Sequence, residues 1–318
     1  MRYVIIGTSA AGLAAAEVLR ARDRGGGITL IGEEMHLPYS RPLLTYLLGR
    51  EIQPQQIFLK SAAYFAEWGF TPLLGEPVVR VDPEAREVRL AGGRAVSYDR
   101  LLIASGARPR LPGIPGEDLP GVYTLRHLAD VRRLDAGLTP GETVAVVGGG
   151  AVGLKTAEAL NHRGHPVILI EAEARVLPRL LDETAAEFLH QHLARMGMEL
   201  ILNARPTAVL DSQGRVRGLS LADGLEIAVT TVVFAVGVTP RTEFLEGTGV
   251  AGPEGIGVDQ FLQSKYPTIY AAGDCALPRH WLTGEPAAYQ IWPAAVATAR
   301  SAMKASSVSP ERCDTTLV

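Results

Sequence analysis

The chain has 318 residues, a formal net charge of −3, a 47% hydrophobic composition, 34 glycines and 21 prolines. That length accommodates two domains of ordinary size, and the glycine content is typical of an α/β protein with many tight turns. The small net charge and the lack of a long basic block argue against nucleic acid or an anionic membrane as a partner. No apolar run approaches the length of a membrane span and no leader precedes the first strand, so we expect a cytoplasmic protein.

The first part of the chain predicts a strand, a glycine-rich loop and a helix. Residues 2–6 form an apolar run typical of a buried parallel strand, and residues 10–22 are alanine-rich with helical spacing. Three glycines then lead into a second strand at 28–31, which completes a βαβ unit of about 30 residues. Downstream we expect a small meander of strands at 77–81, 87–90 and 101–104.

The second part repeats this order after a linker marked by prolines. Apolar residues at helical spacing predict a helix at 125–134, and a second βαβ unit follows with a strand at 143–147, a helix at 151–163 and a strand at 166–170. A further helix is expected near 185–196, then a second meander through 206–234 that ends in a strand at 231–235. Residues 256–318 are expected to return to the first domain, with a last helix from about Ala294 and a loose polar tail at 306–318.

Two glycine-rich loops are the most informative feature of the chain. The first runs from Gly7 through Ser9, Ala10 and Ala11 to Gly12, and the second contains Gly148, Gly150, Val152 and Gly153. A strand, a tight glycine turn and a helix N-terminus present backbone N–H groups and the positive helix end to a pyrophosphate. Two such loops predict a protein that holds two dinucleotides and passes electrons between them.

Each second strand is followed by a carboxylate that would accept hydrogen bonds from the ribose hydroxyls of an adenosine. In the first unit this is Glu33, with Glu34 as a rival, and in the second it is Glu171. A carboxylate there repels a 2′-phosphate, so Glu171 favours NAD over NADP. Arg175, four residues further on, would soften that preference.

The motif order resembles the FAD- and NAD(P)-dependent pyridine nucleotide oxidoreductases. The resemblance rests on residues 5–12, 30–34, 36–44, 102–106, 123–126, 235–240 and 270–274. Within that family it is similar to ferredoxin and rubredoxin reductases and to the flavin portion of NADH-dependent nitrite reductases. It implies two Rossmann-like domains: a discontinuous FAD-binding domain at 1–115 and 246–305, with a NAD-binding domain at 116–245 inserted in it.

The resemblance also implies roles for individual residues. The first loop would hold the FAD pyrophosphate and the second loop would hold NAD(H), with Glu33 and Glu171 on the two riboses. The remaining FAD contacts would be Arg41, Pro42, Val78, Ala104, Ser105, Gly106, Arg126, Gly273, Asp274 and Trp292, and Gly237 would join the NAD site. For Trp292, a place in the core is an equally good interpretation.

The positions of the cysteines limit which class of electron acceptor is expected. Thiol-dependent relatives need a redox cysteine beside the flavin, but the first 274 residues contain none, and Cys275 and Cys313 have neither disulfide nor metal-site spacing. We therefore expect electrons to leave the flavin directly for a one-electron carrier such as a ferredoxin, a rubredoxin or another iron–sulfur protein. The alternatives are a flavin NADH oxidase that reduces oxygen or a quinone, and a non-catalytic flavin-binding subunit for assembly or sensing.

Two departures from similar ferredoxin reductases remain. Those proteins place a lysine at the position of Tyr46 and a glutamate at that of Lys155, on the nicotinamide side of the flavin. We expect Lys155 to be the catalytic cation here, and a solvent-facing lysine is the alternative. Relatives also continue into a C-terminal domain beyond the last helix, so either a partner subunit covers the flavin or the flavin is more open than usual.

Overall fold

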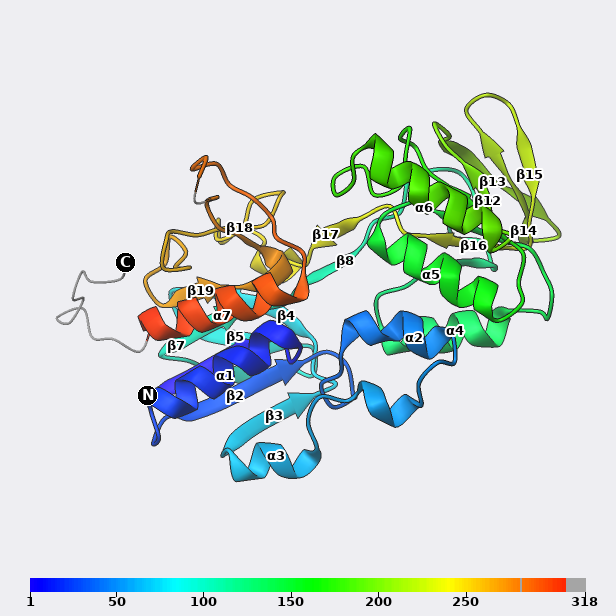
Figure 1. The fold of residues 1–318 in the computed structure, drawn as a ribbon. Coiled ribbons are helices and arrows are strands. Elements are labelled where there is room, and N and C mark those ends of the chain that lie inside the picture. Colours follow the sequence, from blue (N-terminus) through cyan, green and yellow to red (C-terminus); the bar gives the residue numbers. More distant parts are fainter. Residues whose placement is uncertain (281, 307–318) are drawn as a thin grey trace. The chain divides into compact units, whose positions relative to one another are not determined.

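The computed structural model describes residues 1–280 and 282–306, so Cys313 and the predicted tail after Ser306 lie outside the described residues. The chain divides into two compact units, and each has its own five-stranded sheet (Figure 1). Unit 1 comprises Met1–Ser40, Phe58–Arg108 and the described residues from Thr239 on, and unit 2 comprises Arg41–Ile57 and Pro109–Val238.

The sheet of unit 1 is wholly parallel and has the strand order β19-β7-β1-β2-β3. Its strands are β1 (Arg2–Ile6), β2 (Gly27–Gly32), β3 (Phe70–Leu74), β7 (Arg100–Ile103) and β19 (Ile269–Ala271). The predicted strands at 2–6 and 28–31 and the predicted helix at 10–22 are confirmed. Four successive residues of the central strand β1 are buried, so both faces of the strand are covered, which explains the continuous apolar run.

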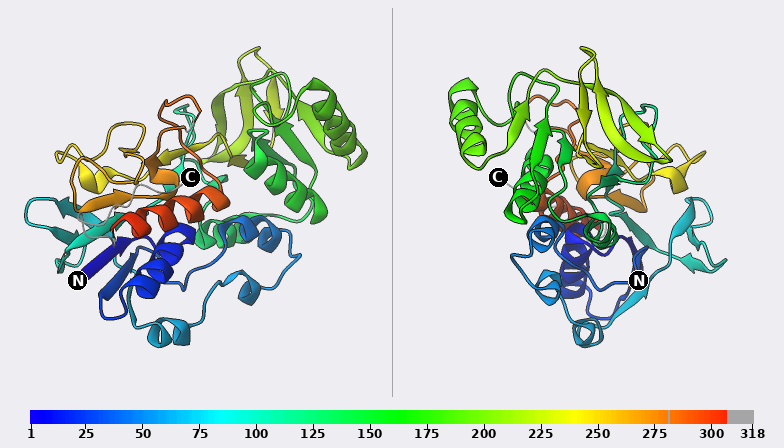
Figure 2. Two further views of the ribbon diagram at one scale, coloured as in Figure 1. Left: turned by 60° about the vertical axis from the view of Figure 1, so that its left-hand side comes forward. Right: turned by 90° about the vertical axis from the view of Figure 1, so that its right-hand side faces the viewer.

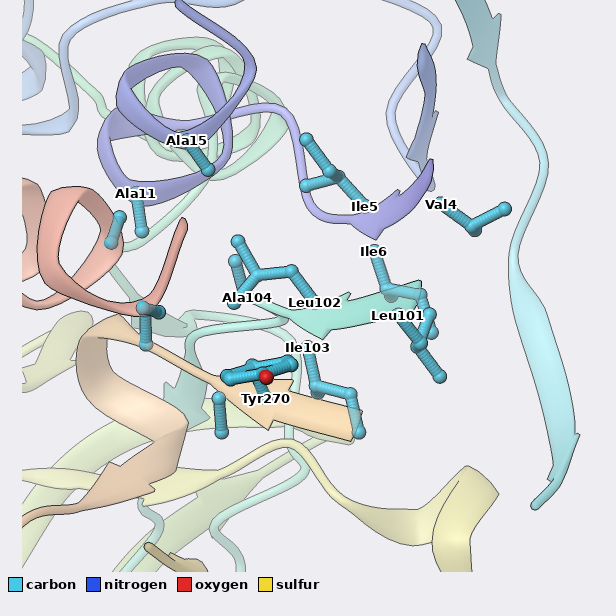
Figure 3. Close-up of a cluster of buried hydrophobic side chains, with 14 of the residues drawn as sticks. Val4, Ile5, Ile6, Ala11, Ala15, Leu101, Leu102, Ile103, Ala104 and Tyr270 are labelled. Atoms are coloured by element: carbon cyan, nitrogen blue, oxygen red, sulfur yellow. The ribbon is translucent and has the colours of Figure 1, made fainter. Parts of the chain in front are cut away.

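Two helices of unit 1, α1 (Ala10–Arg22) and α7 (Trp292–Ser306), pack against each other, and the two figures show them side by side (Figures 1 and 2). On the sheet, Ile5 and Leu102 stand opposite each other in register. Figure 3 shows them beside Ala11 and Ala15 of α1, and all four side chains are buried. The alanines are small, so the helix lies close to the strands and the core is densely packed.

A three-stranded antiparallel meander follows β3, and it corrects one prediction. Its strands are β4 (Val78–Asp82), β5 (Glu87–Leu90) and β6 (Ala95–Ser97). The predicted strand at 101–104 exists as β7, but it joins the parallel sheet between β1 and β19 instead of the meander. The run is fully buried on both faces, as a central parallel strand is, whereas the meander strands carry exposed residues.

The sheet of unit 2 has the order β12-β11-β10-β16-β9 and is also parallel throughout. Its strands are β9 (Val122–Thr124), β10 (Val144–Val147), β11 (Val167–Ile170), β12 (Glu199–Ile201) and β16 (Thr231–Phe234). A meander of β13 (Pro206–Ser212), β14 (Arg215–Leu221) and β15 (Glu226–Ala228) separates β12 from β16. Here too the last predicted meander strand, 231–235, belongs to the parallel sheet.

The two sheets therefore share one design. In each unit the βαβ strands are followed by a third strand, a meander and a strand that returns beside the first. The fifth strand differs, because β19 follows the rest of its sheet in the chain and β9 precedes the rest of its own. The helices of unit 2 are α4 (Leu128–Gly137), α5 (Ala151–His162) and α6 (Glu183–Arg195), as predicted to within a few residues.

The compact units differ from the predicted domains in one segment. Residues 41–57, which the sequence assigned to the FAD-binding domain, group with unit 2 and contain η1 (Arg41–Leu43), α2 (Leu44–Leu48) and η2 (Pro54–Ile57). The Arg163 side chain of unit 2 donates to the Leu48 carbonyl and pairs with Asp135 at 2.6 Å. Gly49 lies so close to α5 that a Cβ on it would be 3.4 Å from Ala159. The other boundaries fall after 108 and 238 rather than after 115 and 245.

The remaining elements are short. Unit 1 contains α3 (Ala62–Glu67), η3 (Glu243–Leu245), β18 (Ile256–Gly257), η4 (Gly273–Cys275) and β20 (Ala276–Leu277). The segments β8 (Ala107–Pro109) and β17 (Val238–Pro240) lie at two of the four points where the chain passes from one unit to the other.

The packing of the second glycine loop makes a testable prediction. A Cβ on Gly153 would lie 1.8 Å from the carbonyl oxygen of Gly148, whereas a Cβ on Gly150 would meet nothing within 4 Å. We expect Gly153→Ala to lower the free energy of unfolding by about 1–3 kcal/mol, because backbone must move to admit the methyl group. Gly150→Ala is the control without a steric clash, expected to cost no more than about 1 kcal/mol, because alanine is a poorer N-cap than glycine. Urea unfolding followed by far-UV circular dichroism measures both, and equal stabilities would contradict the close approach.

Candidate dinucleotide-binding sites

The second glycine loop joins β10 to α5 at the carboxyl edge of the unit 2 sheet. The Gly148 N–H donates to the Ile170 carbonyl at 2.8 Å, and its φ of +111° is one that only glycine adopts readily. Gly150 is the N-cap of α5, so the N–H groups of its first turn, including those of Val152 and Gly153, have no partner within the helix. These groups and the positive helix end make a ready site for a pyrophosphate.

Glu171 follows β11 directly and lies beneath this loop. Its side chain is buried, and one carboxylate oxygen accepts from the Gly149 N–H at 2.6 Å while the other accepts from the Glu173 N–H at 3.0 Å. A carboxylate has about four lone-pair positions, so two remain for ribose hydroxyls. Gly149 was not predicted as a site residue, and only its place within a run of three glycines signalled it.

Gly237 lies at the same edge of the unit 2 sheet, three residues after the end of β16. Because β16 pairs in parallel with β10, Val147 stands opposite Phe234 and both strands end together. Gly237 has a φ of +104°, and its carbonyl accepts from the Arg110 N–H at 2.9 Å. The predicted NAD residues are thus brought to one sheet edge.

The first glycine loop of unit 1 has the same geometry. The Gly7 N–H donates to the Ile31 carbonyl at 2.8 Å, and Gly7 approaches so closely that a Cβ would lie 2.1 Å from the Ala104 carbonyl oxygen. Ser9 is the N-cap of α1, and Ala10, Ala11 and Gly12 form a buried first turn. Serine replaces the usual second glycine without changing the course of the backbone.

The two loops differ in what lies beneath them. Because Gly7 bonds to Ile31 as Gly148 bonds to Ile170, Gly32 occupies the position that Glu171 has in unit 2. A Cβ on Gly32 would come within 2.9 Å of the Thr8 side chain, just as one on Gly149 would come within 2.9 Å of the Glu171 carboxylate. In unit 1 the loop provides the larger residue, Thr8, and the glycine follows the strand. In unit 2 the loop provides the glycine, Gly149, and the larger residue, Glu171, follows the strand.

The two glutamates predicted for the FAD ribose come one and two residues after Gly32 and lie further out. Glu33 is exposed and ion-pairs with Arg241, and Glu34 is partly buried and accepts from the Tyr39 hydroxyl at 2.6 Å. Glu33 retains the more accessible carboxylate, and the choice between the two glutamates stays a prediction. Arg241 was not foreseen, because nothing in its local sequence signals a partner more than 200 residues away.

The other predicted FAD residues of unit 1 lie mostly at the carboxyl ends of β7 and β19, the edge that also carries the first loop. After β7, the Ser105 hydroxyl donates to the Arg241 carbonyl at 2.6 Å and the Gly106 carbonyl accepts from the Arg241 N–H at 3.0 Å. After β19, Gly273 has a φ of +73° and donates to the Thr298 hydroxyl at 3.1 Å, with Asp274 next in η4.

The remaining predicted FAD residues lie elsewhere. Trp292 begins α7 and packs, partly buried, against the core of unit 1, and Val78 begins β4. Arg41 and Pro42 group with unit 2, where the Arg41 guanidinium donates to the Arg126 carbonyl at 2.7 Å. The structure thus brings Arg41 and Arg126 together.

Lys155 lies on α5, one turn into the helix that begins after the second glycine loop. Its ammonium is 4.6 Å from the centre of the Tyr46 ring on α2 and 2.5 Å from a carboxylate oxygen of Glu158. The hydrogen bond to Glu158 is the largest of the effects that raise the pKa of Lys155. The lysine therefore stays charged and rests on an aromatic face, which holds a cation by its ring quadrupole.

Cys275 is fully buried in unit 1. Its sulfur lies 3.4 Å from the carbonyl oxygens of Ile103 and Ala272, either of which can accept the thiol proton, and burial raises the pKa of the thiol. A thiol held in this way is a packing residue and a poor nucleophile.

Within residues 1–280 and 282–306, no group of three or more histidine, cysteine, aspartate or glutamate side chains is arranged to hold a metal ion. No helix in that part of the chain has both the length and the apolar character needed to cross a membrane.

Comparison with known proteins identifies the family. The family model described as pyridine nucleotide-disulphide oxidoreductase matches residues 1–299. The chain belongs to this family. It is 38% identical over 275 residues to the ferredoxin–NAD(+) reductase component of the p-cumate 2,3-dioxygenase system of Pseudomonas putida, covering 86% of this chain and 67% of that protein. This relative and two further curated reductases that the chain matches are longer, and the chain spans about two thirds of their length.

Solved structures agree with that assignment. The ferredoxin reductase for the CYP199A2 system from Rhodopseudomonas palustris superposes with a TM-score of 0.92 at 31% identity, covering 97% of this chain and 76% of that one. The covalent putidaredoxin reductase–putidaredoxin complex matches with a TM-score of 0.89 at 27% identity, covering 95% of this chain and 74% of that one. The predicted family and the predicted α/β fold with two dinucleotide-binding domains are confirmed.

The position of Glu171 leads to a prediction about coenzyme choice. We expect Glu171→Gln to lower the ratio of kcat/KM for NADH to that for NADPH by about 5- to 150-fold, because the repulsion of a 2′-phosphate disappears. Steady-state rates with a one-electron dye measure the ratio. Glu173→Gln, which neutralises the exposed carboxylate two residues away, is the matched control and should leave the ratio unchanged. An unchanged ratio in Glu171→Gln would mean that another group sets the preference.

Proposed function

We propose that this chain is an FAD-dependent oxidoreductase that transfers electrons between NAD(H) and a one-electron iron–sulfur protein of the ferredoxin or rubredoxin type. The observation that carries the proposal is the presence of two glycine-loop sites, each on its own parallel sheet and each with its own helix N-terminus. Bound flavin would supply the exchange between a two-electron hydride and single electrons. The family of the chain and its ferredoxin–NAD(+) reductase relative support this assignment.

Unit 1 is proposed to hold FAD and unit 2 to hold NAD(H). The loop from Gly7 to Gly12 would bind the FAD pyrophosphate, with Glu33 on the ribose, and the segments after β7 and β19 would line the rest of the cofactor. In unit 2, the first turn of α5 would bind the NAD pyrophosphate and Glu171 the ribose. The fit rests on the two loops, where a Cβ on Gly7 or Gly148 would meet a neighbouring carbonyl within 2.5 Å.

The proposed acceptor follows from the cysteines. Cys275 is buried and its thiol is held as a hydrogen-bond donor, and no cysteine precedes it in the chain. With no accessible thiol in these residues, direct transfer from flavin to a one-electron carrier is the simplest route. The complex of putidaredoxin reductase with putidaredoxin offers a precedent for such a partner. We place the reaction in the cytoplasm, where NADH is available.

Two other functions receive less support. A flavin NADH oxidase would use the same two sites but would need no protein partner, and the two relatives compared above are named as ferredoxin reductases. A non-catalytic flavin-binding subunit would not need an intact second loop or the buried Glu171, and both are present.

The acceptor proposal is tested with purified protein and added FAD. We expect one FAD per chain, bleaching by NADH without oxygen, and NADH-dependent reduction of a ferredoxin. Cys275→Ser should leave the rate of ferredoxin reduction within about threefold of wild type, equivalent to about 0.7 kcal/mol of barrier, because no thiol takes part. Loss of ferredoxin reduction in a variant that still binds FAD would reveal a thiol relay. Rapid consumption of oxygen with no ferredoxin reduction would favour the oxidase.

Lys155 is proposed as the catalytic cation of this reaction. A positive charge near the reduced flavin would stabilise the negative charge that develops there, and such preorganised charge is a large term in catalysis. Tyr46 and Glu158 hold the ammonium in place, one through its ring and the other through its carboxylate. Similar reductases have a lysine at the position of Tyr46 and a glutamate at that of Lys155. In this proposal Lys155 on α5 supplies the positive charge in their place.

We expect Lys155→Met to keep FAD bound and to slow flavin reduction by NADH about 10- to 100-fold, because one positioned charge is lost. Lys60→Met is a matched control: its ammonium lies 4.2 Å from the centre of the Tyr64 ring and 3.0 Å from a carboxylate oxygen of Glu17, an equivalent arrangement within unit 1. Anaerobic stopped-flow absorbance measures both rates. A wild-type rate in Lys155→Met would show that the lysine only makes structural contacts between α5 and α2 and takes no part in flavin reduction.

A further inference from the structure

We propose that Arg175 is a positioning residue that braces the coenzyme-ribose site, and that it is not a ligand for the 2′-phosphate of NADPH. The proposal concerns the segment 172–181, here called the ribose loop, which connects Glu171 to α6. It rests on the proposed binding of NAD(H) to unit 2. Sequence alone allows the opposite role, because an arginine four residues after the ribose carboxylate is well placed to meet an added phosphate.

Two of the five N–H donors of the Arg175 guanidinium already bond to carbonyls within the loop. Its Nε donates to the Leu181 carbonyl at 3.1 Å and its Nη2 donates to the Pro178 carbonyl at 3.5 Å. The two bonds join the start of the ribose loop to its end and close it into a compact turn. A planar guanidinium suits this role because its N–H groups are fixed in direction and it is always charged.

Further bonds tie the ribose loop to its surroundings. The Leu177 N–H donates to the Gly149 carbonyl at 2.9 Å, and Leu177 has a positive φ of +48°. The Val176 side chain is fully buried, and its N–H donates to Nε2 of His190 on α6 at 3.3 Å. A leucine in this backbone conformation persists only when its neighbours hold it there.

Gly149 connects the ribose loop to the carboxylate. Its N–H donates to Glu171 and its carbonyl accepts from Leu177, so this one residue joins the glycine loop to both sides of the ribose site. If Arg175 turned toward a phosphate, the closing bonds to Leu181 and Pro178 would break. The negative charge of Glu171 would still repel the phosphate, and the ribose loop would no longer be closed by the Arg175 hydrogen bonds. This coupling predicts that Arg175 affects NADH and NADPH alike.

The test compares Arg175→Ala and Arg175→Lys with Arg205→Ala, in FAD-loaded protein. Arg205 is the matched control, because its exposed guanidinium only pairs with Glu173 of the same loop at 3.4 Å. We expect Arg175→Ala to raise KM for both nucleotides by about tenfold, which corresponds to about 1.4 kcal/mol. The limiting rate of flavin reduction and the ratio of NADH to NADPH efficiency should stay the same. A lysine cannot form both closing bonds, so Arg175→Lys should lie in between.

Limited trypsin digestion provides a readout that needs no nucleotide. Arg179 lies exposed in the ribose loop, and cleavage after it should be faster in Arg175→Ala and unchanged in Arg205→Ala. If Arg175→Ala loses efficiency with NADPH alone, or if neither KM nor cleavage changes, the bracing role is overturned. If wild type binds FAD but not NADH, the proposed function fails, and the digestion still decides whether Arg175 braces the loop.

Discussion

The close approach of a helix N-terminus to the end of a strand is the constraint on which both sites depend. In unit 2 the backbone of Gly153 stands over the carbonyl of Gly148, and in unit 1 Gly12 stands over Gly7 in the same way. A single methyl group at either contact would push helix and strand apart. Without it, the unpaired N–H groups of the first helical turn converge with the positive helix end on one point, where a pyrophosphate is stabilised.

The space beneath each loop then decides what kind of polar group the site contains. In unit 2, Gly149 leaves room for the Glu171 carboxylate, which the loop N–H groups hold in place. In unit 1, Thr8 takes that room and Gly32 stands where the carboxylate would be, so Glu33 lies further out and pairs with Arg241. The two sites share a fold, and they differ in where the carboxylate lies because the glycine and the larger residue have exchanged places.

Polar groups around both sites hold one another in place. Arg175 closes the ribose loop, Tyr46 and Glu158 hold Lys155, and the Arg241 backbone holds Ser105 and Gly106. A side chain held in this way loses little conformational freedom on binding, which favours affinity and exact placement. The same contacts limit how each residue can move, because Arg175 must break its bonds to the two carbonyls before it can turn toward a phosphate.

The sequence by itself determined the parallel-strand runs, the two loops, the main helices and the carboxylate after each second strand, because these follow from local burial, backbone freedom and helix spacing. Only the tertiary structure decided that 101–104 and 231–235 join parallel sheets instead of meanders. An apolar run indicates that a strand is buried, but it does not indicate which strand lies next to it. It also grouped residues 41–57 with unit 2 and revealed the Arg241 and His190 contacts. These depend on pairs of residues distant in the chain, and no local pattern encodes which surfaces meet.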